Sequence, residues 1–263
     1  MPKMTKDGAF AGIDVGTTTT KAVVISADKE VLGRFVRRSG TDLELAAMEA
    51  FEEAVKQAGI APKAIRHIMA TGYGRKNVPF AHDTMTEISC HGRGCYHYFP
   101  EAITVVDIGG QDNKIIKLNA QGRRIGFKMN RKCAAGTGAF LEETAYKMGI
   151  PIGDLNDLAH ATTETAQIGS YCTVFTATEV LDRIRAGERT DSIVRGLFDS
   201  VVKRILEMDT LTGRVIMTGG VVAFNDIVVE LLSARAGVEV EVAPHPQEMG
   251  AFGAALFSVN GDQ

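Results

Sequence analysis

The sequence predicts an α/β protein built from two related halves, and two observations lead to this prediction. Residues 14–21 (DVGTTTTK) return in altered form as residues 107–114 (DIGGQDNK), and the same offset aligns Gly33 with Gly126. Each copy follows an apolar run, turns on glycine and resumes an apolar run, which is typical of two strands joined by a tight turn. Stretches with helical periodicity follow both copies, and 263 residues suffice for two such halves.

The first half is predicted to contain a hairpin, a helix and a strand. The hairpin covers residues 10–35. The helix begins at a capping-box pattern, TDLE at 41–44, and ends at Gly59. Its apolar stripe is predicted to consist of Leu45, Met48, Phe51 and Val55. The strand covers residues 65–70 and ends in a glycine turn.

The second half opens at Ile103, and it repeats the hairpin before helices alternate with a strand at 214–218. The predicted helices cover residues 139–148, residues 176–186, a long stretch after Thr190, a stretch from about Asn225 and residues 249–259. We place one half at residues 1–102 and the other at residues 103–245. Residues 246–263 are expected to pack back against the first half.

The composition excludes several classes of protein. Hydrophobic residues make up 45% and charged residues 23% of the chain, and the net charge is −3. This balance argues against nucleic acid or an acidic membrane surface as the main partner. No apolar run could span a bilayer, and the N-terminus lacks the apolar core of an export signal. We therefore expect a cytoplasmic protein.

Three glycine turns at strand ends, at Gly16, Gly109 and Gly219, point to phosphate binding. Glycine lets the backbone approach a ligand, and consecutive N–H groups form a concave anion site. The motifs DVGTTTTK, DIGGQD and MTGG resemble the phosphate-1, phosphate-2 and adenosine motifs of the acetate kinase/sugar kinase/Hsp70/actin superfamily. This resemblance implies two ribonuclease-H-like halves, as in actin-like ATPases, with ATP in the cleft between them.

The chemistry of these residues suggests a role for each. Asp14 and Asp107 offer hard oxygen ligands, suited to Mg²⁺ directly or through water. Gln111 could orient the attacking water, as glutamine does in other NTPases. The residues whose amides and hydroxyls could hold the phosphates are Gly16, Thr17, Thr18, Thr19, Gly109 and Gly110. Gly219 and Gly220 would let adenosine lie against the backbone.

The other charged residues of the two turns are open to two interpretations. Lys21 could lie near the phosphates, or it could be solvated. Asp112 and Lys114 equally fit exposed charges on a hairpin.

Longer motifs give a sharper resemblance. NRKCAAGTGAFL (130–141) is followed by SYCTVF (170–175), and ATGYGR (70–75) and SCHGRG (89–94) accompany VDIGGQD. Together they resemble the ATP-dependent reductive activators, which are activators of 2-hydroxyacyl-CoA dehydratases and ATPase subunits of benzoyl-CoA reductases. The resemblance covers residues from about 11 to 257.

This resemblance implies a homodimer of anaerobic metabolism that holds one [4Fe-4S] cluster between its subunits, with Cys133 and Cys172 of each as ligands. It implies an ATPase that passes one electron to a dehydratase or reductase component. Ferredoxin or flavodoxin is the electron donor that it implies.

The residues themselves support this placement. Cys133 directly precedes the helix start at Gly136, Thr137 and Gly138, and Cys172 precedes the helix at 176–186. N–H groups at helix N-termini stabilise thiolates and anionic clusters. A cubane cluster takes four thiolates, which two cysteines per chain supply only across a two-fold axis. The Gly-Thr-Gly segment could also contact phosphate, and so couple nucleotide to cluster.

The remaining cysteines leave alternatives open. Cys90 lies in a matching motif but has no ligand role in the family, and Cys95 fits a core or interface position. A four-cysteine cluster within one chain and a mononuclear metal at His91 and His97 remain alternatives.

The adenosine loop departs from the family pattern. It reads GGVVAFN at 219–225, one residue longer than the GGVAxN form of dehydratase activators. This leaves open the role of Asn225, and whether the partner is a dehydratase or a reductase.

Two other functions fit the same sequence. A small-molecule, sugar-type kinase of the superfamily would need a catalytic Asp base, and usually carries more insertions than this lean chain. A non-enzymatic, ATP-gated binding module would leave the cysteines inert. Brown colour after anaerobic purification would favour the reductive activator.

Overall fold

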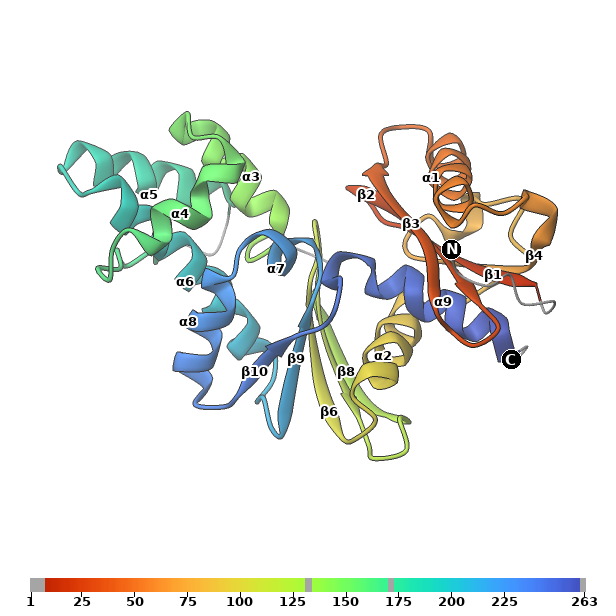
Figure 1. The fold of residues 1–263 in the computed structure, drawn as a ribbon. Coiled ribbons are helices and arrows are strands. Elements are labelled where there is room, and N and C mark those ends of the chain that lie inside the picture. The colour runs from red at the N-terminus through yellow and green to blue at the C-terminus, as the bar shows by residue number, and fades with distance from the viewer. Residues whose placement is uncertain (1–7, 131–133, 170–172, 261–263) are drawn as a thin grey trace. The chain divides into compact units, whose positions relative to one another are not determined.

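The computed structural model describes residues 8–130, 134–169 and 173–260, and the chain divides into two compact units. The first unit comprises residues 1–101, 118–124 and 248–263, and the second comprises residues 102–117 and 125–247. Each unit has one five-stranded sheet with helices packed on it (Figure 1). The predicted α/β class is confirmed.

The first sheet has the strand order β3-β2-β1-β4-β5. Its strands are β1 (Ala9–Val15), β2 (Thr19–Ser26), β3 (Val31–Arg38), β4 (Ile65–Thr71) and β5 (Asp83–Thr84). Strand β1 pairs antiparallel with β2 and parallel with β4, and β4 pairs parallel with β5. The hairpin and the strand predicted for this half are confirmed.

The second sheet repeats this arrangement, with the order β8-β7-β6-β9-β10. Its strands are β6 (Ile103–Ile108), β7 (Asn113–Leu118), β8 (Arg124–Asn130), β9 (Arg214–Thr218) and β10 (Val240–Val242). As in the first sheet, the first strand of the repeat pairs parallel with the fourth, and the fourth with the fifth. The sequence repeat is therefore also a repeat of sheet topology.

Helix α1 (Leu43–Ala58) begins one residue later than the capping-box pattern predicts. Its N-cap is Asp42, whose Oδ1 accepts a hydrogen bond from Leu45 N at 2.9 Å. Since Glu44 is then only the second residue of the helix, it cannot complete a capping box. The predicted end is confirmed, because Gly59 caps the helix in the left-handed region with φ of 67°.

The predicted apolar stripe of α1 is partly wrong, because Leu45 and Met48 are each 42% exposed. The helix instead buries a face of small residues together with Phe51 and Val55, namely Ala46, Ala47, Ala50 and Ala54. The reason lies in the sheet, where a Cβ on Gly33 would stand only 2.1 Å from Ala54 O. The glycine and the alanines let the helix backbone approach β3 closely.

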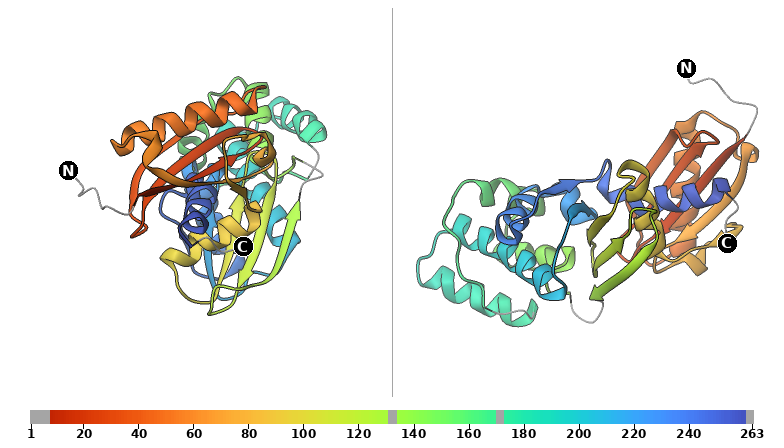
Figure 2. Two further views of the ribbon diagram at one scale, coloured as in Figure 1. Left: turned by 90° about the vertical axis from the view of Figure 1, so that its right-hand side faces the viewer. Right: turned by 90° about the horizontal axis from the view of Figure 1, so that it is seen from below.

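Helix α9 (Met249–Asn260) lies on the face of the first sheet opposite to α1, and α2 (Glu87–Tyr98) lies beside α9 (Figures 1 and 2). Helix α2 was not predicted from the sequence. It is unusually rich in glycine, and the glycines serve close packing: a Cβ on Gly94 would stand 2.8 Å from Met249 O. On the other helix, a Cβ on Gly253 would stand 1.8 Å from Cys90 O.

The described residues of the second unit form six helices, of which α3, α4 and α5 group at one end (Figure 1). They are α3 (Gly138–Met148), α4 (Leu155–His160), α5 (Thr173–Arg185), α6 (Thr190–Met208), α7 (Gly220–Phe224) and α8 (Ile227–Ala236). All but the short α4 and α7 were predicted. Helices α6 and α8 share one apolar core with β6, β7 and β9. Within the described parts of both units, no helix has the length and hydropathy needed to cross a membrane.

Gly33 and Gly126, which occupy equivalent positions of the repeat, offer a matched pair for testing the close packing of α1. A Cβ on Gly126 would meet no described atom within 4 Å. We expect Gly33→Ala to lower the free energy of unfolding by about 2–3 kcal/mol through overpacking. Gly126→Ala should change it by less than about 0.5 kcal/mol. Urea unfolding of both variants measures the difference, and equal losses would contradict the packing described here.

Candidate functional site

The first glycine turn lies between β1 and β2 and presents a buried carboxylate. Gly16 N donates to Thr19 O at 3.1 Å, which closes the turn. Asp14, near the end of β1, is 5% exposed, and its Oδ2 accepts a hydrogen bond from Lys21 Nζ at 3.2 Å. Lys21 is therefore an ion-pair partner of Asp14 and not a freely solvated charge.

Glycines of two other elements border the Asp14 carboxylate. Thr71, the last residue of β4, pairs with Asp14 in the sheet, and Gly72 follows it with φ of 89°. A Cβ on Gly72 would stand 2.4 Å from Asp14 Oδ1. A Cβ on Gly250, in the first turn of α9, would stand 2.9 Å from Asp14 Oδ2 and 3.0 Å from His91 Nε2. Side chains at either position would crowd the carboxylate, so both glycines keep a polar cradle around it.

The hydroxyl groups of Ser39 and Thr20 form a hydrogen-bond network that holds the same turn. Ser39 Oγ donates to Gly16 O at 2.7 Å and lies 2.9 Å from Thr20 Oγ1. Ser39 N donates to Thr18 O at 3.0 Å. Because Thr20 is fully buried in this network, the surface hydroxyls of the turn are those of the three residues before it, as the sequence analysis expected.

The second turn has the same construction at the equivalent positions. Gly109 N donates to Asp112 O at 2.9 Å, as Gly16 N does to Thr19 O in the first turn. Lys114 Nζ donates to Asp107 Oδ2 at 3.0 Å and to Asp112 Oδ1 at 2.8 Å. Lys114 is only 2% exposed, which rules out the alternative of an exposed hairpin charge.

The two turns differ in their balance of charge. In the first, one carboxylate faces one ammonium group, because position 19 is a threonine. In the second, Asp107 and Asp112 both face Lys114. Among the described residues, the second turn therefore has one more acidic than basic group and is the better environment for a cation, whereas the side-chain charges of the first turn balance.

The predicted adenosine turn borders the carboxylate of Asp107. Thr218, the last residue of β9, pairs with Asp107 in the sheet, and its Oγ1 donates to Asp107 Oδ1 at 3.0 Å. Gly219 follows with φ of 103°, and a Cβ there would stand 2.8 Å from the same oxygen. Gly219 therefore borders the carboxylate of Asp107 in the same way that Gly72 borders the carboxylate of Asp14.

The remaining predicted residues of this turn lie at its rim. Gly220 is the first residue of α7, and a Cβ on it would stand 3.6 Å from Gln247 Nε2. Asn225 caps the end of α7, and its Nδ2 donates to Val221 O at 2.8 Å. Gln111 lies exposed at the tip of the second turn.

The segment of Gly136, Thr137 and Gly138 contacts the second turn directly. Gly138 N donates to Gly109 O at 2.9 Å, and Ala139 N donates to Gly110 O at 2.7 Å. The amide of Gly138 is therefore engaged by the protein itself. The structure brings together Asp107, the turn that follows it, the start of α3 and Gly219, all within the second unit.

The sequence analysis missed the residues that border Asp14, namely Thr71, Gly72 and Gly250. The first two carry a readable signal, since ATGYGR and MTGG both place Thr-Gly at the end of a buried strand. Thr218, equivalent to Thr71, was missed in the same way. Gly250 has no local signal, because its contact with Asp14 joins the two ends of the chain.

The predicted cluster ligands Cys133 and Cys172 lie outside the described residues. Cys90 and Cys95 are buried thiols on α2. Burial raises the pKa of Cys90 to about 12, so this thiol stays protonated, whereas a metal ligand is a thiolate.

His91 and His97, the alternative metal site, both lie on α2. The His97 ring packs edge-on against Tyr98 and Phe252, and burial lowers its pKa. Within the described ranges, no group of three or more His, Cys, Asp or Glu side chains could hold a metal ion.

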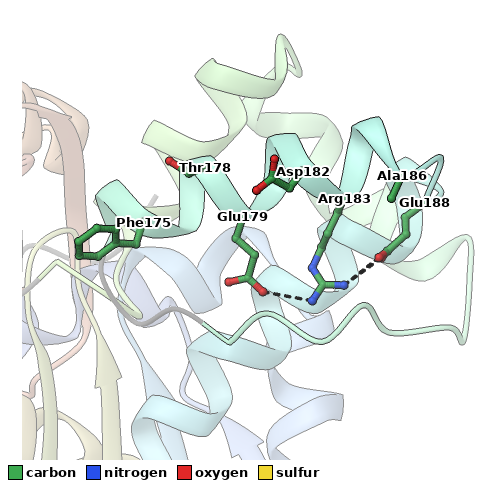
Figure 3. Close-up of a pocket in the computed structure, with 7 residues that line it drawn as sticks. All are labelled: Phe175, Thr178, Glu179, Asp182, Arg183, Ala186 and Glu188. Carbon is green, nitrogen blue, oxygen red and sulfur yellow. Dashed lines mark hydrogen bonds and ion pairs between the residues drawn. The ribbon is translucent and has the colours of Figure 1, made fainter.

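An open pocket of about 520 Å³ lies along α5. Its lining residues are Phe175, Thr178, Glu179, Asp182, Arg183, Ala186 and Glu188. Figure 3 shows Arg183 reaching both Glu179 and Glu188, at 3.1 Å and 2.9 Å. Glu179 Oε1 also accepts from Gly169 N at 2.9 Å, so the network fastens the preceding chain to α5. None of the predicted nucleotide residues lines this pocket.

The chain was compared with known proteins. The profile of the BadF/BadG/BcrA/BcrD ATPase family matches residues 11–258. The chain is 39% identical to the activator of lactoyl-CoA dehydratase from Anaerotignum propionicum, over 96% of this chain and 98% of that one.

Two solved structures match over nearly the whole chain. Component A of (R)-2-hydroxyglutaryl-CoA dehydratase from Acidaminococcus fermentans has a TM-score of 0.91 at 35% identity, covering 96% of this chain and 98% of that one. The activator of 2-hydroxyisocaproyl-CoA dehydratase from Clostridium difficile, with bound ADPNP, has a TM-score of 0.90 at 34% identity, covering 96% and 95%. These matches confirm the predicted actin-like ATPase fold and the family resemblance.

The buried ion pairs predict unequal costs for removing the two lysines. Lys114→Met would strand two carboxylates and should lower the free energy of unfolding by roughly 3–5 kcal/mol. Lys21→Met strands only one and should cost less. Lys117→Met, which breaks a partly exposed pair with Asp209 farther along β7, should cost less than about 1 kcal/mol. Urea unfolding tests this order, and a Lys114→Met variant as stable as Lys117→Met would contradict it.

Proposed function

The chain belongs to the BadF/BadG/BcrA/BcrD ATPase family, and we propose that it is an ATP-hydrolysing electron donor that activates a partner enzyme. The partner is a 2-hydroxyacyl-CoA dehydratase or a benzoyl-CoA reductase-type enzyme, which receives one electron at a time. The observation that carries the proposal is the buried Asp–Lys pair over a glycine turn, present in both units. Relatives named as dehydratase activators favour this function over a small-molecule kinase.

Asp107 is the residue best suited to a Mg²⁺ ion. Mg²⁺ prefers oxygen ligands and keeps several waters. The second turn supplies the carboxylates of Asp107 and Asp112, with an excess of acidic groups, and Gly219 leaves the Asp107 carboxylate uncrowded. These residues fit the ion. Asp14, in the first unit, is likewise proposed as a carboxylate suited to Mg²⁺, directly or through water.

The first turn is suited to the terminal phosphates. The hydroxyls of Thr17, Thr18 and Thr19 are proposed to donate hydrogen bonds to phosphate oxygens, and Gly16, whose own N–H closes the turn on Thr19 O, lets a phosphate approach the backbone. Lys21 adds a positive charge. It can turn towards a phosphate by giving up one ion pair, the one with Asp14. Lys114 is less suited to this role, because it would have to leave two carboxylates, those of Asp107 and Asp112.

The remaining nucleotide contacts come from the second unit. Gly109 and Gly110 are proposed to face the phosphates, and Gln111 to orient the attacking water. Gly220 would let adenosine lie against α7, with Gly219 and Asn225 shaping that end of the site. Gly136, Thr137 and Gly138 support the turn from behind.

Cys133 and Cys172 are the residues proposed to hold an iron–sulfur cluster. A cubane takes four thiolates, which Cys133 and Cys172 would supply from each chain of a homodimer. The group supplies a one-electron carrier, which ferredoxin or flavodoxin would reduce and the partner enzyme would oxidise. Residues 134–138, next to Cys133, adjoin the second glycine turn, so nucleotide binding at that turn would affect the segment beside the cluster ligand.

We expect Asp14→Asn and Asp107→Asn each to slow ATP hydrolysis by at least about a hundredfold, because each removes a group that organises the metal and phosphates. Asp28→Asn, which changes an exposed carboxylate in the β2–β3 turn, is the control and should leave turnover unchanged. ATP turnover is measured on variants whose circular dichroism shows an intact fold. Wild-type turnover in either variant would contradict the assignment.

Anaerobically purified protein should contain about two iron and two sulfide per chain, because one four-iron cluster is shared by two chains. Cys133→Ser and Cys172→Ser should each lose both and become mainly monomeric in size-exclusion chromatography. Cys95→Ala should retain the iron. Four irons per chain, or full iron content in a Cys133→Ser variant, would instead indicate a cluster within one subunit.

A further inference from the structure

Helix α3 begins on the second glycine turn. The first amides of a helix have no partner within it, and a side chain usually caps them. In α3 the N-cap residue Thr137 provides no side-chain cap. The carbonyls of Gly109 and Gly110 take that place, accepting from Gly138 N and Ala139 N. A Cβ on Gly138 would stand 3.3 Å from Gly110 Cα, so only glycine allows this contact without a shift.

These two hydrogen bonds also fix where the next amides of the turn point. In a planar trans peptide, the C=O of one residue and the N–H of the following residue point in opposite directions. Because Gly109 O and Gly110 O face α3, the N–H groups of Gly110 and Gln111 face away from it. Two successive amides turned the same way form a site for an anionic oxygen. Gln111 thus offers its backbone amide in addition to its side chain.

Phosphate binding and the start of α3 are therefore linked through the same two peptide groups. An anion bound to the N–H of a peptide polarises its C=O, and the hydrogen bond that this carbonyl accepts becomes stronger. A phosphate oxygen on Gly110 and Gln111 would strengthen the bonds from Gly138 and Ala139. Its departure would weaken them.

One side chain holds the adjoining segment in place. Asn113, the first residue of β7, is fully buried, and its Nδ2 donates to Gly136 O at 2.8 Å. Its Oδ1 is buried and accepts no hydrogen bond from the described residues. Gly136 has φ of 78°, and a Cβ there would stand 2.9 Å from Arg204 Cβ on α6. The segment before α3 thus packs against α6, and the side chain of Asn113 gives it a polar attachment to the second turn.

We propose that Asn113 is the positioning residue that couples the nucleotide state of this turn to the chain between residue 134 and α3. The proposal rests on the proposed function, since it needs the turn to bind phosphate. With Gly136 held by Asn113, a change at Gly109 and Gly110 moves residues 134–139 as one body. Without that bond, the first turn of α3 absorbs the change by loosening.

Hydrogen exchange measured by mass spectrometry tests this on the full chain, purified anaerobically. In the wild type, ADPNP should slow exchange of the Gly138 and Ala139 amides relative to ADP. A difference of about threefold to tenfold corresponds to the net value of a single hydrogen bond. In Asn113→Ala the difference between ADPNP and ADP should vanish, while calorimetry finds both nucleotides still bound with near wild-type affinity.

Two further variants complete the experiment. Asn113→Asp keeps the side-chain volume but removes the donor, so it should behave like Asn113→Ala even if the smaller residue destabilises the fold. Asn119→Ala removes a half-buried asparagine whose Oδ1 accepts hydrogen bonds from Gln121 N and Arg123 N in the β7–β8 turn, and it should keep the wild-type difference. A purely structural role for Asn113 would speed exchange equally with both nucleotides and leave their difference intact.

Three results would overturn the inference. One is a wild-type difference that persists in folded Asn113→Ala and Asn113→Asp. Another is a wild type that binds both nucleotides and exchanges identically with each. A wild type that binds no nucleotide would overturn the proposed function and the coupling with it, and calorimetry distinguishes that case from the other two.

Discussion

A buried carboxylate held by a lysine at the end of a strand constrains most of the architecture described here. Asp107 and Lys114 are each only 2% exposed, and such a pair is tolerable only when further hydrogen bonds satisfy both groups. Thr218 meets that requirement from β9, and Asp112 meets it from the turn. Burial of this pair therefore requires three features at once. They are the register of β6 with β9, the closure of the turn and the glycine that follows β9. Asp14 imposes the same demands in the first unit.

The two copies of this arrangement differ in the number of carboxylates that pair with the lysine. Thr19 stands where the second copy has Asp112, so Lys21 has one carboxylate partner and Lys114 has two. A lysine with one partner can leave it for a phosphate at modest cost. A lysine with two is a fixed part of the core, and the excess acidic group beside it attracts a cation. Among the described residues, this one change of charge leaves the side-chain charges of the first turn balanced and gives the second turn an excess of acidic charge.

The sequence predicted what depends on local patterns, namely the strands, the glycine turns, most helices and the two aspartates. It failed where packing partners are distant. Periodicity gave α1 the wrong face at Leu45 and Met48, because Gly33 selects an alanine surface that a hydropathy pattern does not reveal. Helix α2 was missed since its glycines weaken the helical signal, although they serve contact with α9. Gly250 reaches Asp14 only through the chain's far end.

The turn after Asp107 and the start of α3 cannot be treated as separate elements. A helix capped by its own side chain can shift without disturbing its neighbours, but α3 takes its cap from the backbone of Gly109 and Gly110. The carbonyls of these peptide groups complete the helix, and their N–H groups point away from it. A ligand bound to those N–H groups would strengthen the hydrogen bonds that the carbonyls accept from α3, without itself contacting the helix. In our proposal the strength of this link depends on the segment before the helix staying fixed, to which Asn113 contributes its hydrogen bond to Gly136 O.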